Sequence, residues 1–70
     1  MQRQAVVSSE MSSVGYDHAS GILEIEFKSG AVYQYFIVPK RIYDGLTDAE
    51  SKGSFFAQNI KDKFAYSRVS

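Results

Sequence analysis

Residues 22–38 read ILEIEFKSGAVYQYFIV, two strand-like segments separated by one glycine. From Ile22 to Lys28 apolar and charged residues alternate, which is the period of a half-buried β-strand. Residues 31–38 are rich in aromatic and β-branched residues and predict a second strand. Gly30 lies in the turn between them, so this stretch predicts a β-hairpin.

The length of the turn at Gly30 decides which face of the hairpin carries Tyr33 and Tyr35. A three-residue loop with a bulge at Gly30 places Tyr33 beside Ile25 and Tyr35 beside Leu23. A two-residue loop places both tyrosines with the glutamates on the other face, because a slip of one residue reverses every side chain. We favour the bulged loop, because serine is a poor residue for the first left-handed position of a type I′ turn.

The flanking residues extend this hairpin at both ends. Residues 14–16 predict a short preceding strand, residues 17–21 a turn, and residues 1–10 a flexible arm or a short extra strand. Pro39 ends the third strand, because proline has no N–H for the ladder.

Residues 39–52 predict either one bent helix or two short ones, because Gly45 weakens the middle. Thr47-Asp48-Ala49-Glu50 also has the form of a capping box. A last helix carries Phe56, Ile60 and Phe64 at helical spacing, and residues 65–70 form a terminal extended segment.

We therefore predict an α+β domain over residues 11–70. Its three-stranded antiparallel β-meander is followed by two or three short helices packed on one face.

The composition of the chain excludes several classes of function. The chain has 70 residues, with 8 Lys+Arg, 8 Asp+Glu and no cysteine. A neutral, thiol-free domain has neither the large positive field of a general polyanion binder nor a cysteine-based metal site. No apolar run approaches the ~20 residues of a membrane span. We expect a cytoplasmic protein that does not bind membranes, and because so small a sheet has open edges, a homo-oligomer.

Catalytic patterns are not evident in the sequence. The single histidine, His18, lies in a polar turn and is expected to be a solvated loop residue. Glu24 and Glu26 share a strand face with Lys28, which favours a solvated row of charges over an acid–base pair. No nucleophile-elbow, zinc-protease or P-loop motif occurs. We therefore predict no enzymatic activity, no cofactor and no metal.

Three groups of residues have a ligand-binding interpretation beside a structural one. Tyr33 and Tyr35 could stack nucleobases, although the favoured register packs them in the core, with their hydroxyls reaching a pocket as an intermediate case. The turn from Ser51 to Ser54 could hold an anion at a helix N-terminus, or only cap that helix. The basic residues of the second half form either a groove for one phosphate or a solvated helix surface; they are Lys40, Arg41, Lys61, Lys63 and Arg68.

Several short motifs together resemble the KTSC family, the small domain named after the C-terminal piece of some lysyl-tRNA synthetases. The resemblance covers about residues 13–68. It rests on VGYD at 14–17, LEIEF at 23–27, the YQY motif at 33–35, VP at 38–39, SKGSFF at 51–56, NIK at 59–61 and YSR at 66–68. It implies a stand-alone bacterial or phage protein with no general activity to carry over. RNA binding follows from it only by analogy with the synthetases.

These observations predict a small binding module for a nucleotide-type ligand, and sequestering a nucleotide signal is one role that such a module could have. The pocket would be aromatic-lined and could lie between subunits. The candidate binding residues are Tyr33, Tyr35, Ser51, Gly53, Ser54, Phe55, Lys61, Tyr66 and Arg68. The alternatives are an RNA or tRNA-binding module and a protein-interaction module that uses an exposed sheet edge.

Overall fold

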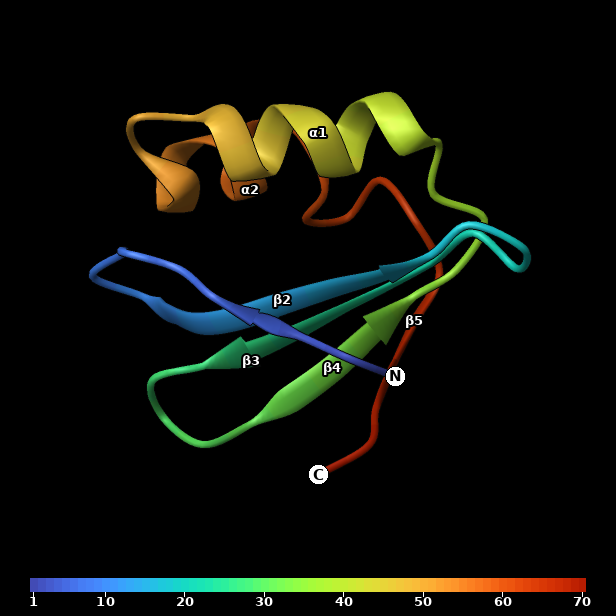
Figure 1. Ribbon diagram of the computed structural model, residues 1–70, viewed down its shortest axis with the longest axis horizontal. Coiled ribbons are helices and arrows are strands. Elements are labelled where there is room, and N and C mark those ends of the chain that lie inside the picture. The colour runs from blue at the N-terminus through green and yellow to red at the C-terminus, as the bar shows by residue number, and fades with distance from the viewer.

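The computed structural model describes all residues, 1–70, as one antiparallel sheet covered on one face by two helices (Figure 1). The strands are β1 (Gln4–Ala5), β2 (Met11–Asp17), β3 (Ile22–Phe27), β4 (Val32–Tyr35) and β5 (Tyr66–Arg68), in that order across the sheet. The helices α1 (Lys40–Asp48) and α2 (Lys52–Asn59) lie between β4 and β5 in sequence. Neither helix has the length and apolar character to cross a bilayer.

The α+β class is confirmed, but the predicted three-stranded meander is too small. The sheet has five strands, because the N-terminal arm pairs with β2 and the C-terminal segment pairs with β4. The helices therefore do not simply follow the meander, since the chain returns from α2 to add β5 beside β4.

The turn at Gly30 is the bulged three-residue loop, as predicted. The Phe27 N–H donates to the Ala31 carbonyl at 2.9 Å, and Gly30 adopts a φ of 96° that favours glycine. Tyr33 consequently pairs with Ile25 and Tyr35 with Leu23. Both tyrosines lie on the face that the helices cover.

The chain leaves β4 earlier than predicted. Ile37 has a left-handed φ of 57° and is 80% exposed, so the strand ends at Tyr35 rather than at Val38. Val38 returns to the core, where its N–H donates to the Gly21 carbonyl and its carbonyl accepts from the Tyr16 hydroxyl at 2.6 Å. Pro39 is the N-cap of α1.

Residues 39–52 contain one helix, α1, and not two short ones, and α2 is the last helix that the sequence predicted. Gly45 lies inside α1 and does not end it. The missing side chain leaves room for the Phe55 ring, since a Cβ at this position would lie 2.5 Å from Phe55 Cζ. The predicted capping box is wrong, since Thr47 lies within α1 and Ser51 is the N-cap of α2. The last helix is also shorter than predicted, ending at Asn59 before Phe64.

The core lies between the sheet and the helices. Eight buried side chains form it. They come from β2, β3, β4 and α1, from the loop before α1 and from the C-cap of α2: Met11, Val14, Leu23, Ile25, Tyr35, Val38, Leu46 and Ile60. In β3 the core residues alternate, as the period of a strand requires, whereas Met11 and Val14 of β2 are three positions apart because the register shifts between Met11 and Ser13.

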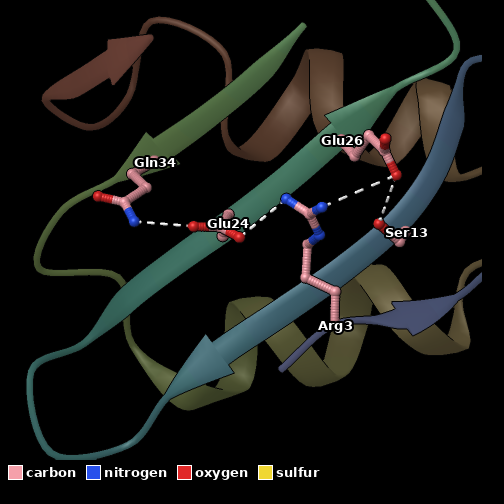
Figure 2. A network of polar contacts seen from close by, with 5 residues as sticks. All are labelled: Arg3, Ser13, Glu24, Glu26 and Gln34. Atoms are coloured by element: carbon pink, nitrogen blue, oxygen red, sulfur yellow. Dashed lines mark hydrogen bonds and ion pairs between the residues drawn. The ribbon is translucent and has the colours of Figure 1, made fainter. Parts of the chain in front are cut away.

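A polar network covers part of the other face (Figure 2). Arg3 crosses β2 and donates to Glu24 at 2.9 Å, while Gln34 donates to the second oxygen of the same carboxylate at 2.8 Å. Glu26 accepts from Ser13 at 3.0 Å. Glu24 is only 8% exposed, so the expected row of solvated charges is wrong at this position, because the N-terminal arm covers it.

The close approach of this arm depends on Gly15. A Cβ at Gly15 would lie 2.5 Å from the Gln2 carbonyl oxygen and 3.0 Å from the Arg3 side chain. The missing side chain therefore lets Arg3 reach over β2 to Glu24.

We predict that Arg3→Met lowers the free energy of unfolding by about 1–3 kcal/mol, because it leaves the Glu24 carboxylate buried without its cation. The double variant Arg3→Met/Glu24→Gln should lose less, since a neutral amide still accepts from Gln34. Urea denaturation measures both. Arg41→Met, which removes an exposed arginine without an ion pair, is the control. Equal losses in the single and double variants would contradict this account.

Candidate functional site

Five aromatic rings meet on the helix-covered side of the sheet, at its β4–β5 end. Their centroids form a connected set with neighbouring separations of 5.5–6.4 Å. The sheet supplies four of the rings and α2 supplies the fifth: Phe27, Tyr33, Tyr35, Tyr66 and Phe56. The bulged turn aligns Phe27 with Tyr33 and Tyr35, and the β4–β5 pairing places Tyr66 opposite Tyr35.

These rings line a cavity of about 660 Å³, which we call the aromatic cavity. The remaining lining residues are small or charged: Ser9, Glu10, Lys28, Ser29, Ala31, Lys61, Asp62 and Arg68. Three cations and two carboxylates therefore surround the aromatic floor. This combination can hold a planar ring together with one anionic group.

The three tyrosines occupy different depths. Tyr35 is 5% exposed and belongs to the core, Tyr33 is half-buried, and Tyr66 is 56% exposed. Tyr33 and Tyr35 therefore lie on the core side of the sheet and also line the cavity, while the position of their hydroxyls in a pocket stays a prediction. Tyr66 at the rim has a ring free to pack against another group.

The electrostatics of the cavity floor hold Tyr35 neutral. Burial raises the pKa of Tyr35 to about 12, and the neighbouring Tyr33, Tyr66 and Asp62 add to the shift. The raised pKa keeps the Tyr35 hydroxyl protonated in the alkaline range where an ordinary tyrosine ionises.

The structure brings together five of the nine predicted binding residues. Tyr33, Tyr35, Lys61, Tyr66 and Arg68 all line the aromatic cavity. The other four, which belong to the start of α2, do not line it: Ser51, Gly53, Ser54 and Phe55.

The start of α2 is occupied by the chain's own groups. Ser51 accepts from the Ser54 N–H at 3.3 Å, which is ordinary helix capping. The Glu10 carboxylate lies against Gly53, where a Cβ would be 2.7 Å from its oxygen. Lys52 turns away and donates to the Ala49 carbonyl at 3.0 Å. A carboxylate in this position repels an anion, so the first turn of α2 is a poor phosphate cradle.

Sequence reasoning missed the other eight cavity residues, among them Phe27, Lys28 and Phe56. Phe27 could have been found, since the predicted register already placed it on the same face as Tyr33. Phe56 depends on how α2 packs over the sheet, which no local pattern specifies. His18 lies away from this cavity, in contact with Tyr16 at a ring separation of 5.0 Å.

The comparisons with known proteins agree on one family. A family model described as KTSC domain matches residues 7–64. A crystal structure of a KTSC domain protein from Yersinia pestis is 43% identical and superposes with a TM-score of 0.96, covering 99% of this chain and 97% of that one. An uncharacterized protein of Stutzerimonas stutzeri is 43% identical over 70 residues, 99% of each chain.

A second kind of relative is much longer than this chain. A lysine–tRNA ligase of Trichormus variabilis is 44% identical over 55 residues, which are 79% of this chain but 10% of the ligase. A lysine–tRNA ligase of Nostoc punctiforme is 40% identical over 62 residues, 11% of its length. The similarity to these ligases is therefore confined to one small segment of each.

We predict that one tyrosine titrates late in alkaline solution. The folded chain holds the Tyr35 proton more tightly than the unfolded chain, whose tyrosines have a pKa of about 10. Stability contributed by this group is complete below about pH 10 and is lost as the pH rises toward about 12. Phenolate absorbance measured against pH should lose its late component in Tyr35→Phe. Tyr43→Phe, which does not line the cavity, should retain it, and loss of the late component in both variants would contradict the assignment.

Proposed function

The chain belongs to the KTSC domain family, and we propose that it is a non-enzymatic binding module for a nucleotide-type small ligand held in the aromatic cavity. The observation that carries this proposal is the convergence of five aromatic rings with three cationic side chains around one open space of about 660 Å³. That volume falls within the range of small-ligand sites, ~300–1,000 Å³.

The aromatic rings suit the base of such a ligand. Every nucleobase has a π-face, and stacking on an aromatic side chain contributes about 1–3 kcal/mol per base. Tyr66 offers the most exposed ring at the cavity rim, with Tyr33 beside it at a centroid separation of 5.8 Å. A base that enters the cavity would lie against these two rings.

The cations suit one phosphate group. Lys28, Lys61 and Arg68 line the cavity together with the carboxylates of Glu10 and Asp62. The local surplus of positive charge is therefore small, in a chain whose formal net charge is zero. This balance favours a mononucleotide or dinucleotide over a long polyanion, which needs a continuous basic track.

Binding without turnover is part of this proposal, because the serines of the cavity have no histidine beside them to activate them. The two serines that line it are Ser9 and Ser29, and the only histidine of the chain, His18, does not line it. Ser29 instead accepts from the Ala31 N–H at 3.4 Å. A protein that binds a nucleotide and does not turn it over would sequester it, which is the role we propose.

Calorimetry against a panel of mono- and dinucleotides tests the proposal. We expect binding that weakens about tenfold in Tyr66→Ala, through lost stacking, and also weakens in Lys61→Gln. Lys63→Gln is the matched control, because Lys63 is exposed two residues away and does not line the cavity. No heat from any nucleotide with the folded protein would refute the proposal.

A second candidate function, RNA or tRNA binding, is favoured by one observation. Lysine–tRNA ligases contain a segment 40–44% identical to this chain. If the cavity cations contact phosphates of a tRNA, each neutralised phosphate adds about 0.7–0.9 to the slope of log affinity against log salt.

We predict for this alternative a tRNA affinity that falls with a salt slope of about −2, measured by fluorescence anisotropy. Lys61→Gln should reduce the slope by about one unit, and Lys63→Gln should leave it unchanged. Undetectable tRNA binding at low salt would remove this candidate and leave the small-ligand proposal standing.

A further inference from the structure

The outer edge of β5 is an open strand edge directly beside the aromatic cavity. β5 is the last strand of the sheet, and two of its three residues, Tyr66 and Arg68, line the cavity. Tyr66 is 56% exposed and the neighbouring Val69 is 49% exposed. An unpaired edge of this kind is a template for pairing with another strand.

The hydrogen bonds to β4 determine which backbone groups of β5 face outward. The Phe36 N–H donates to the Ala65 carbonyl at 2.9 Å, and the Val69 N–H donates to the Val32 carbonyl at 2.8 Å. Because bonding residues alternate along an antiparallel strand, residues 65, 67 and 69 face β4. The N–H and C=O groups of Tyr66 and Arg68 therefore point away from the sheet.

We propose that β5 pairs antiparallel with β5 of a second copy, about a two-fold axis at Ser67, so that each copy completes the other's aromatic cavity. In this register Tyr66 lies opposite the partner subunit's Arg68, and the outward backbone groups of both residues are satisfied. Both side chains lie on the cavity face, as their pairing with Tyr35 and Tyr33 shows. Arg68, whose Nε donates to the Ser70 carbonyl of its own chain at 2.9 Å, would then lie opposite the partner subunit's Tyr66, and a guanidinium placed over that ring is attracted to it.

Charge selects this register over its neighbour. A shift that centres the axis on Arg68 would place two arginines directly opposite each other, which destabilises a strand pair. With the axis at Ser67, the only residue that faces its own copy is a neutral, exposed serine on the opposite face of the sheet. The surface is therefore self-complementary, as a two-fold interface requires.

The other edge of the sheet is less suited to this pairing. β1 contributes only two residues, and Arg3 next to it is engaged with Glu24. β1 is also remote from the cavity, since none of its residues lines it. Pairing at β1 would leave the cavity unchanged, whereas pairing at β5 adds a second arginine and tyrosine at its rim.

Sedimentation over a concentration series tests the pairing without any ligand. We expect a wild-type dimer, and we expect Ser67→Asp and Ser67→Lys each to weaken dimerisation at least about tenfold by opposing like charges across the axis. Mixing the two variants should restore a heterodimer, because the opposed charges are then opposite in sign. Gln4→Asp, an equal charge change on β1, is the control and should leave the dimer intact. Circular dichroism shows whether each variant is folded.

The strand pairing and the proposed function can fail separately. Only the idea that the pairing completes a ligand cavity rests on the proposed function. If the wild type is monomeric at every concentration, the pairing is overturned, even if nucleotides bind. The same holds if the Ser67→Asp variant dimerises as strongly as the wild type. A dimer broken only by the Ser67 charges supports the pairing even if no nucleotide binds. If both hold, nucleotide affinity should fall in Ser67→Asp and return in the mixture of the two variants.

Discussion

The bulged turn at Gly30 is the constraint on which the rest of the molecule depends. Its positive φ fixes the register of β3 on β4, and that register places Tyr33 and Tyr35 against the helices. A slip of one residue would move both rings to the opposite face and leave the core without Tyr35. β5 then pairs with β4, so the position of Tyr66 also follows from this turn.

The aromatic rings serve the core and the cavity together. Tyr35 packs with Leu23 and Ile25 in the core, while its ring also contacts Phe56 and Tyr66 at the cavity. A 70-residue domain has little apolar material to spare, so a separate core and binding surface would each be small. Substitutions at the deepest ring should therefore change stability first, whereas substitutions at the rim should change binding with little effect on folding.

The sequence was most informative where a structural cause is local. The alternation of residues 22–28 and the turn chemistry of Gly30 sufficed to predict the hairpin and its register. β1 and β5 have only two and three residues, so they carry no periodic signal and exist only through their partners. The burial of Glu24 could not be predicted for the same reason, because it depends on Arg3, which is 21 residues away in the sequence. The shape of the candidate site was predictable in its strand residues and not in α2, whose placement depends on packing.

For the function that we propose, the charges around the cavity are a stronger argument about the kind of ligand than the volume of the cavity is. A continuous polyanion would bring several phosphates past Glu10 and Asp62, whose carboxylates oppose it at the same rim where Lys61 and Arg68 attract it. In the proposed complex a compact nucleotide would meet the cations with its phosphate group and would present the N–H groups of its base to the carboxylates, which are acceptors. The mixed charges at one rim would thus weaken the binding of a long nucleic acid, whereas they would orient a small ligand. The mixed charge of the cavity, rather than the neutrality of the whole chain, is the stronger physical reason to place a nucleotide there.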